Sequence, residues 1–257
     1  MFISIVTVVY NGERTIRRTI ESVLFQKFTD YEYIIVDGLS KDNTVSIAKE
    51  YEDRFSGRLR IYSERDKGIY DAMNKGISLS KGDYIWLVNA DDFICGNALQ
   101  ELYDYCINIG FKESVISSGM NIVDSCTNQI RYTTKGGNIE NFNNACRQLK
   151  MGISHPATIV HRGVYDKIGV YDDRYYISAD VDFCIRCYRE KITVLFSSLV
   201  ITNMTDGGIS NSLPIKKCLH DCNIRTSKFC KSSLHRTTYT IWYFVRLLIV
   251  KIIGYQH

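Results

Sequence analysis

The feature that most constrains the fold is a run of five apolar and aromatic residues, Tyr84–Val88, that ends directly in the polar segment Asn89–Asp92. An uninterrupted run of this kind is typical of a strand buried on both faces of a parallel sheet. Two adjacent carboxylates at the end of such a strand are costly unless they are solvated, cap a helix or bind a cation. In open α/β sheets, ligands bind outside the carboxyl ends of the strands. The sequence therefore predicts a ligand site after residue 88.

The first hundred residues predict an α/β fold, because strand-like runs alternate with helical patterns. In chain order these segments are 2–9, 13–25, 33–36, 44–52, 59–63, 69–79 and 84–88. Apolar residues in 69–79 recur with a period near 3.6, as on one face of a helix. In the helix at 13–25 we expect Arg14, Arg17 and Arg18 to face solvent. Segments that alternate at this spacing form a mostly parallel, Rossmann-like sheet flanked by helices, with right-handed crossovers.

Three of the predicted strands end in polar residues. Tyr10 and Asn11 follow the first strand, Asp37 ends the second, and Asn89–Asp92 follows the strand at 84–88. Because the carboxyl ends of parallel strands lie along one edge of a sheet, we expect these side chains to meet there. Loops that follow strands are often polar for no functional reason, but three such ends together with a double Asp favour a common site.

The second half of the sequence predicts a less regular series of elements. We expect helices at 96–107, 163–168 and 180–190 and strands at 115–118, 120–123, 158–160 and 192–196. Arg131–Asn144 is rich in Gly, Asn and Thr, which favours a long, mobile loop. Loops of that length in a compact domain are often lids.

The excess positive charge lies near the C-terminus. Residues 212–257 hold eight Lys and Arg against one acid, Asp221, whereas the rest of the chain holds 24 basic and 27 acidic residues. This asymmetry predicts an anionic partner surface. We expect no nucleic-acid partner, because the basic residues are not interleaved with aromatic residues on a known nucleic-acid-binding fold. Residues 1–9 lack the features of an export signal, so we expect a cytoplasmic protein.

Two helices are predicted in this basic segment, at 213–230 and 237–253. The second places Trp242 and Ile249 on one side and Arg246 on the other. Its apolar run is shorter than the ~20 residues that a membrane-spanning helix needs. A basic amphipathic helix fits the interface of an anionic membrane. The alternative is a terminal helix that docks on the domain or on a partner chain.

A series of motifs resembles those of the family 2 inverting glycosyltransferases, in the order in which that family has them. The motifs are Ile5–Asn11, Ile34–Thr44, Asp66–Gly76, Asn89–Asp92, Ile153–Thr158 and Ala179–Phe183. The resemblance covers about residues 2–210 and looks closest to bacterial enzymes that build O-antigen, capsule or exopolysaccharide units. It implies a GT-A domain at 1–210, with a nucleotide-binding half (1–95) and an acceptor-binding half (96–210), followed by a basic amphipathic helical tail at 211–257.

The resemblance implies a nucleotide pocket at the first strand ends. In the family, the residue that matches Asp37 accepts an N–H of the nucleotide base, and the residue that matches Asp66 lies near the base and ribose. Tyr10 and Asn11 would line the same pocket. Each acid also has a structural alternative. An Asp before Gly is common in turns, and Asp66 could cap the helix that starts at Ile69, whose N-terminus also favours anions.

The segment Asn89–Asp92 stands where the family has its Asp-x-Asp metal motif. Mn²⁺ and Mg²⁺ prefer hard oxygen ligands and usually take one or two protein carboxylates plus phosphate oxygens. Because the first acid of the motif is Asn89 here, we expect Asp91 to be the direct metal ligand. We assign Asn89 to donor binding, and Asp92 to a second ligand or an acceptor for a sugar hydroxyl. The alternative for Asp92 is the N-cap of a helix.

Asp180 matches the general base of the family. An inverting transfer needs one carboxylate to take the proton of the acceptor hydroxyl as it attacks the anomeric carbon from the opposite face. Composition alone makes an Asp at a helix start a cap. We expect Asp182 to be structural and to pair with Arg186 at i+4. His155, which precedes Pro156, would contact the donor phosphate or the acceptor, or else be a satisfied core residue.

These expectations describe an inverting, metal-assisted glycosyltransferase. It would move a sugar from a nucleoside diphosphate donor, with UDP expected, onto a hydroxyl of a lipid-linked saccharide in surface polysaccharide synthesis. The tail would hold it at the inner face of the cell membrane, and a second copy of the chain is a further expected partner. One alternative is a sugar nucleotidyltransferase, which needs a Gly-rich loop where Tyr10–Arg14 has one Gly. The other is a non-catalytic nucleotide-sugar-binding module.

Overall fold

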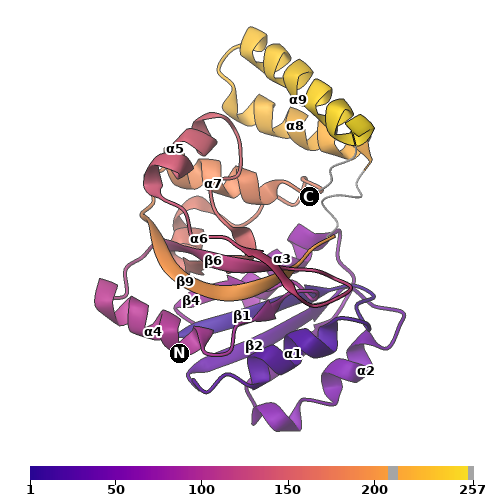
Figure 1. The fold of residues 1–257 in the computed structure, drawn as a ribbon, viewed down its shortest axis with the longest axis vertical. Helices are drawn as coiled ribbons and strands as arrows, with labels where there is room; N and C mark the ends of the chain where they lie inside the picture. The colour runs from indigo at the N-terminus through magenta and orange to yellow at the C-terminus, as the bar shows by residue number, and fades with distance from the viewer. Residues whose placement is uncertain (208–213, 254–257) are drawn as a thin grey trace.

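The computed structural model describes residues 1–207 and 214–253. Across these residues, a nine-stranded sheet has the order β3-β2-β1-β4-β8-β6-β9-β5, with β7 paired to β6. Helices cover both faces of the sheet, and two C-terminal helices stand beyond it (Figure 1). The predicted α/β architecture with a C-terminal helical extension is confirmed.

The first four strands form the parallel part of the sheet. They are β1 (Ile3–Val9), β2 (Tyr31–Asp37), β3 (Leu59–Ser63) and β4 (Tyr84–Leu87). Every residue of β1, β2 and β4 is buried. The two faces of β1 explain its continuous apolar sequence, because Ile3 and Ile5 pack into one core and Val6 and Val8 into the other.

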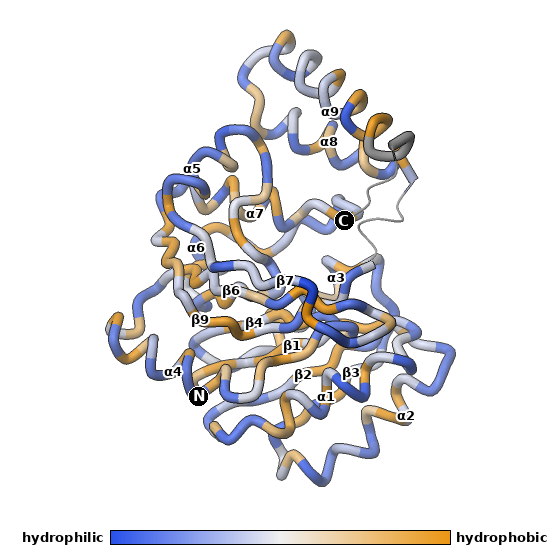
Figure 2. The backbone as a smooth tube through the Cα atoms, viewed as in Figure 1, coloured by the Kyte–Doolittle hydropathy of each residue, from blue (hydrophilic) through white to orange (hydrophobic). Residues whose placement is uncertain are grey.

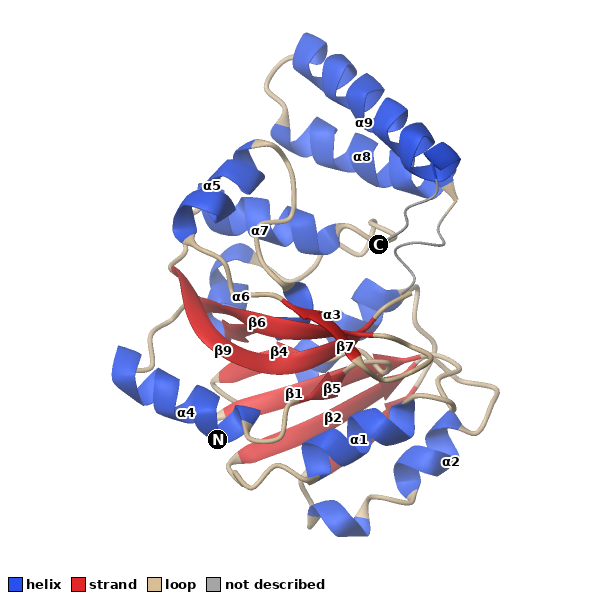
Figure 3. Cartoon of the chain, viewed as in Figure 1, coloured by secondary structure: helices blue, strands red, loops and turns tan. Residues whose placement is uncertain are grey.

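Helices connect these strands on both sides of the sheet. They are α1 (Ile16–Leu24), α2 (Thr44–Lys49) with the short turn η1 (Asp53–Phe55), and α3 (Ile69–Leu79). Ile16 and Ile20 of α1 pack into the core of one face, whereas Met73 and Ile77 of α3 pack into the core of the other. Figure 3 shows α1 and α2 in front of the strands and α3 behind them.

The second half extends the sheet with mixed directions. Its elements are β5 (Phe93–Ile94), α4 (Ala98–Ile109), β6 (Val115–Val123), β7 (Ile130–Thr133), α5 (Ile139–Arg147), η2 (His155–Ala157), β8 (Thr158–His161), α6 (Arg162–Ile168), α7 (Ala179–Arg189) and β9 (Val194–Thr205). β8 is antiparallel to both β4 and β6 and so joins the two parts of the sheet. The α4 helix shares the core of α1, whereas α5, α6 and α7 share that of α3.

Two expectations for this half are wrong. Residues 131–144 do not form a long loop, because they contain most of β7 and the first six residues of α5. Asn138 is the N-cap of α5 and accepts the N–H of Asn141 at 2.9 Å, so polar residues that suggested a loop start a helix. The strands predicted at 115–118 and 120–123 are one strand, β6, which continues through Gly119 with shifts of register against β9.

The C-terminal helices α8 (Ile215–Phe229) and α9 (Ser233–Ile253) form a helical hairpin (Figure 1). Phe229 of α8 packs with Leu149 and Ile185, which ties the hairpin to the domain. Figure 2 shows apolar and polar positions interspersed along α9. Among the described residues, no helix has both the length and the apolarity to cross a bilayer.

Candidate active site

The parallel strand ends bring Asp37 to the edge of the sheet. In the register of the strands, Asp37 lies opposite Val9 of β1 and Ser63 of β3. Asp37 is 1% exposed, and its carboxylate accepts the backbone N–H of Ser40 at 3.1 Å and the hydroxyl of Ser63 at 2.6 Å. An ionised carboxylate has about four lone-pair sites, so these bonds leave acceptor capacity. The contact with a nucleotide base stays a prediction.

Asn11 fastens the loop after β1 to the loop after β2. Its backbone N–H donates to Ser40 Oγ at 2.8 Å, and its side-chain Oδ1 accepts the N–H of Lys41 at 2.8 Å. Asn11 has a φ of 53°, a left-handed conformation that Asn adopts more readily than most residues. The side chain of Asn11 therefore shapes the predicted pocket, while Tyr10 beside it is 58% exposed.

Asp66 joins this group from the segment after β3. A methyl group on Gly38 would lie 2.4 Å from Asp66 Oδ2 and 3.5 Å from Tyr10 Cδ2, so the three residues meet. The other carboxylate oxygen, Oδ1, accepts the N–H of Gly68 at 3.0 Å. Burial raises the pKa of Asp66, and the negative charge of Asp37 is among the causes that raise it further. The N-cap of α3 is Gly68, so the alternative that Asp66 caps this helix is wrong.

Asp92 lies inside the protein beneath this edge. It is 1% exposed. Its Oδ1 accepts the N–H of Thr205 at 3.0 Å, and its Oδ2 accepts from Asn89 Nδ2 at 3.2 Å. Burial raises the pKa of Asp92 to about 7, and the nearby negative charge of Asp91 adds to the rise. The structure thus places the Asp92 carboxylate against β9 and Asn89, and its role toward a donor stays a prediction.

Asp91 is the half-buried carboxylate of this segment. Its backbone carbonyl accepts from the hydroxyl of Thr205 at 2.6 Å and from the guanidinium of Arg18 at 3.0 Å. Burial raises the pKa of Asp91, whereas its own backbone N–H and the positive charge of Arg18 lower it. No hydrogen bond joins its carboxylate to another residue that the structure describes. A hard-oxygen ligand that no other described residue occupies fits Mn²⁺ or Mg²⁺.

The described residues do not supply a full set of protein ligands for a metal ion. In residues 1–207 and 214–253, no group of three or more His, Cys, Asp or Glu side chains is arranged to hold a metal ion. Mg²⁺ and similar ions commonly bind through one or two carboxylates plus substrate phosphates. Within the described residues, the surroundings of Asp91 agree with a metal ion bound by one or two carboxylates and by substrate phosphates, and not with one bound by protein ligands alone.

A third group of residues surrounds the start of α7. Asp180 is half-buried, and its Oδ1 accepts the N–H of Val181 at 2.7 Å. The N-cap of α7 is Ser178, so Asp180 is not the capping residue that composition alone suggests. His155 lies beside it, with Nε2 hydrogen-bonded to the hydroxyl of Tyr171 at 3.1 Å. Asp182 is fully buried and pairs with Arg186 at 2.7 Å, as predicted.

Helix α3 connects the pocket near Asp66 with the group at α7. Tyr70, in its first turn, stacks on Tyr171 with ring centroids 5.7 Å apart. Burial raises the pKa of Tyr70, and the nearby backbone N–H groups of Ala179 and Asp180 counteract that rise. Helix α3, which begins just after Asp66, therefore reaches the start of α7 through Tyr70. The loop after β1 also reaches the segment after β4, since a methyl group on Gly12 would lie 3.8 Å from Ala90 Cβ.

Arg18 is a residue of the site that the sequence did not reveal. The sequence placed it in solvent, but it is half-buried and its guanidinium lies 4.3 Å over the ring of Phe93. It donates to the carbonyl of Asp91 at 3.0 Å, to Thr205 Oγ1 at 2.7 Å and to Asn128 Oδ1 at 2.7 Å. These partners come from three distant parts of the chain, so no local sequence pattern could have identified it. Tyr70 was missed for the same reason.

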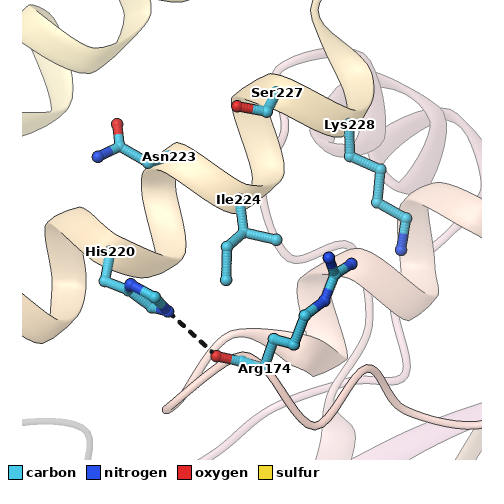
Figure 4. A pocket seen from close by; sticks show the side chains of 6 residues that line it. All are labelled: Arg174, His220, Asn223, Ile224, Ser227 and Lys228. Carbon is cyan, nitrogen blue, oxygen red and sulfur yellow. Dashed lines mark hydrogen bonds between the residues drawn. The ribbon is translucent and has the colours of Figure 1, made fainter.

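A cavity of about 550 Å³ lies elsewhere, between α8 and the loop before α7. Figure 4 shows its lining, with His220 Nε2 bonded to the carbonyl of Arg174 at 3.3 Å. The Arg and Lys side chains of the lining already form ion pairs: Arg174 with Asp172, and Lys228 with Asp182. None of the predicted site residues lines it.

The comparison with known proteins agrees with this arrangement. The profile of glycosyl transferase family 2 matches residues 4–169, which is more than half of the chain. The chain belongs to glycosyl transferase family 2. It is therefore a glycosyltransferase, with the GT-A-like fold that the motifs predicted.

Individual relatives support the same assignment. A PGL/p-HBAD biosynthesis glycosyltransferase of Mycobacterium bovis is 31% identical over 218 residues, which cover 84% of this chain and 82% of that protein. The structure is similar to that of S. aureus TarS in complex with UDP-GlcNAc, with a TM-score of 0.71, 17% identity, and coverage of 95% of this chain and 71% of that one. It is also similar to the mannosyltransferase PcManGT of Pyrobaculum calidifontis in complex with GDP-Man and Mn²⁺ (TM-score 0.66, 13% identity, 99% and 76% coverage).

Proposed function

We propose that this family 2 enzyme transfers a sugar, with inversion, from a UDP-linked donor to a hydroxyl of a lipid-linked saccharide. The observation that most supports this concerns Tyr70, which follows Asp66 by four residues in the first turn of α3. Tyr70 stacks on Tyr171 and lies near the backbone N–H groups of Ala179 and Asp180, so α3 links the nucleotide pocket predicted around Asp66 to the start of α7. A transferase needs its base close to the bond that breaks in the donor.

The donor would lie along the edge formed by the first strand ends. Asp37, Asp66 and Tyr10 would hold the nucleotide, with Asn11 fixing the wall of the pocket. Complexes of the structural relatives support a nucleotide-sugar in this fold, since TarS is seen with UDP-GlcNAc and PcManGT with GDP-Man. We choose UDP because of the TarS complex, which has the higher TM-score of these two.

Asp91 would hold Mn²⁺ or Mg²⁺ together with the donor diphosphate. When bound, such an ion neutralises the negative charge that develops on the leaving diphosphate. Arg18 and Thr205 bind the Asp91 carbonyl, and these two bonds orient the segment that carries the carboxylate. The Mn²⁺ complex of PcManGT supports a divalent ion in this fold. Asn89 and Asp92 would support the donor side of the site.

Asp180 would take the proton of the acceptor hydroxyl. Burial raises the pKa of Asp180 above that of an ordinary Asp, which makes the ionised carboxylate a stronger base. His155 lies near it and would orient the acceptor or the donor phosphate through the nitrogen that does not face Tyr171. The hydroxyl oxygen then forms a bond to the anomeric carbon as the diphosphate oxygen leaves with the electron pair of the broken bond.

The acceptor would be a saccharide on a lipid at the inner face of the cell membrane, in surface polysaccharide synthesis of the O-antigen or capsule type. Exposed apolar side chains gather on α9, including Leu234, Ile241, Trp242, Phe244, Val245 and Ile249. Beside them, Lys150 Nζ lies 5.3 Å over the ring of Trp242. Lys150 and Arg147 hydrogen-bond only to neutral side chains, so their charges are uncompensated among the described residues. An apolar helix face bordered by such cations suits an anionic bilayer surface.

The activity can be tested with UDP-, GDP- and dTDP-sugars, Mn²⁺ and a bacterial membrane lipid extract as the acceptor source. We expect UDP release that depends on the extract and stops with EDTA. Asp180→Asn should lower kcat by about 10²- to 10⁴-fold while UDP still binds. Asp91→Ala should abolish the UDP release that depends on Mn²⁺. Asp104→Asn, on the exposed surface of α4, is the matched control. Donor binding without turnover, or release of pyrophosphate from UTP, would refute the proposal.

A further inference from the structure

One buried carboxylate from α8 holds the loop that precedes the predicted base. Asp221 is 1% exposed. Its Oδ1 accepts the backbone N–H of Tyr176 at 2.9 Å, and its Oδ2 accepts the N–H groups of Ile177 at 2.8 Å and Ser178 at 3.0 Å. The Ser178 hydroxyl adds a fourth hydrogen bond at 3.1 Å. Three consecutive backbone amides thus converge on one side chain that lies far away in the sequence.

The position of this loop gives the contact its importance. Ser178 is the N-cap of α7, and its own side chain makes no cap hydrogen bond. The amide groups at a helix start need acceptors, and here Asp221 supplies them for the residues just before the helix. Asp180 follows Ser178 by two residues, so the loop that Asp221 binds leads directly into the backbone that carries the Asp180 carboxylate. Hydrogen bonds to an ionised carboxylate are about twice as strong as neutral ones.

Other contacts hold the same loop against α8. His220 Nε2 bonds to the carbonyl of Arg174 at 3.3 Å (Figure 4), and the rings of His220 and Tyr176 lie 5.1 Å apart. Further along α8, Lys228 Nζ donates to the buried Asp182 at 2.6 Å. The helix is therefore part of the wall behind Asp180, although the sequence assigned it to a separate tail.

We propose that Asp221 is a positioning residue for Asp180, and that α8 is a component of the active site. This inference rests on the proposed role of Asp180 as the base. Asp221 does not touch the substrate; it fixes the loop 176–178 so that Asp180 keeps its direction and its partial exclusion from water. Because burial raises the pKa of Asp180, a loosened loop that admits water would let this pKa fall toward the ordinary value.

The test is Asp221→Asn in the full chain, with the UDP-sugar that the wild type turns over. Asn lacks one of the two acceptor oxygens, so the loop loses part of its support. We expect kcat to fall at least tenfold, the Kd for UDP with Mn²⁺ to stay within twofold, and the acidic limb of the kcat profile to move to lower pH. Glu32→Gln is the matched control. Glu32 is also a buried carboxylate, but it lies near the start of β2 and pairs with Arg60. We expect Glu32→Gln to lower the stability of the protein without moving the acidic limb of the kcat profile.

The outcomes separate this inference from the proposed function. If Asp180→Asn inactivates the enzyme while folded Asp221→Asn keeps the wild-type kcat and pH profile, the positioning role is refuted and the base assignment stands. A parallel loss of UDP binding and kcat in Asp221→Asn would also refute it, because that marks general damage. If Asp221→Asn does not fold, Ser178→Ala decides, since it removes only the 3.1 Å bond. We then expect a two- to fivefold lower kcat with unchanged UDP binding, and an unchanged kcat overturns the inference.

Discussion

The carboxylate of Asp180 and the imidazole of His155 influence each other's ionisation, although they start from different elements. Burial lowers the pKa of His155, and the negative charge of Asp180 counteracts that effect. Burial raises the pKa of Asp180, and a positive charge on His155 counteracts that in turn. The pair therefore consists of the proposed base and a neighbouring charge partner.

The first prediction concerns the pH dependence of turnover. Asp180 can accept a proton only when it is ionised, so kcat should fall as the pH drops through its pKa. Because that pKa is raised, we expect the midpoint of the acidic limb to lie above about 4, the ordinary value for Asp. The measurement is kcat with saturating donor between pH 4 and 9. A limb at or below the ordinary value would contradict the assignment of Asp180 as the base.

His155→Gln should move that limb to higher pH. As the pH falls, wild-type His155 becomes protonated and its charge helps to keep Asp180 ionised, and Gln cannot supply this charge. Tyr171→Phe is the comparison, since it removes the 3.1 Å hydrogen bond to His155 but keeps the imidazole. We expect the limb to move for His155→Gln and to stay in place for Tyr171→Phe. A shift to lower pH in His155→Gln would show that the two groups do not interact in this sense.

Arg18→Ala should lower the affinity for Mn²⁺ and so raise the Mn²⁺ concentration that turnover requires. The Arg18 guanidinium ties the carbonyl of Asp91 to Thr205, and loss of such an outer contact typically lowers metal affinity by about 10- to 100-fold. The measurement is the Mn²⁺ concentration that gives half-maximal UDP release. Arg14→Ala, an exposed arginine next to the same helix, should leave it unchanged. Equal Mn²⁺ curves for Arg18→Ala and the wild type would refute this role.

Gly76→Ala should destabilise the protein even though Ala favours helices by about 1 kcal/mol over Gly. A methyl group at Gly76 in α3 would lie 2.2 Å from Val6 Cγ1 of β1, so the helix must move away from the sheet. Overpacking of this kind costs about 1–3 kcal/mol. Gly96→Ala is the control, because a methyl group there meets nothing within 4 Å. Denaturant unfolding measures both, and a more stable Gly76→Ala would contradict the close packing of α3 on β1.

Trp242→Ser combined with Ile249→Ser should abolish binding to vesicles that contain anionic lipid. Both side chains are exposed on α9, by 46% and 49%, and the wild type should bind less at high salt because its cations contribute. Ile107→Ser, at an equally exposed position on α4, is the matched control and should bind as the wild type does. Co-sedimentation gives the bound fraction. If the wild type does not bind vesicles, and light scattering shows a dimer that the α9 double variant loses, this face binds a second copy of the chain instead.

The sequence by itself determined the parallel half of the sheet and its helices. The run at 84–88 and its neighbours are apolar without interruption because both faces of those strands are buried, and that pattern is local. The polar residues at the strand ends could be located for the same reason, since parallel strands end at one edge. The helix start at Ile69 and the pairing of Asp182 with Arg186 also follow from spacing along one helix.

Only the tertiary structure decided which side chains meet across that edge. Arg18 contacts Asp91 after β4, Asn128 after β6 and Thr205 at the end of β9. Asp221, in the basic C-terminal segment, binds the loop before α7. The segment 131–144 forms a strand and a helix because β7 pairs with β6 and Phe142 of α5 packs into the core. A hydrogen bond or a packing contact between residues distant in the sequence leaves no periodic pattern and no local motif. Such a contact can therefore be identified only in the folded chain.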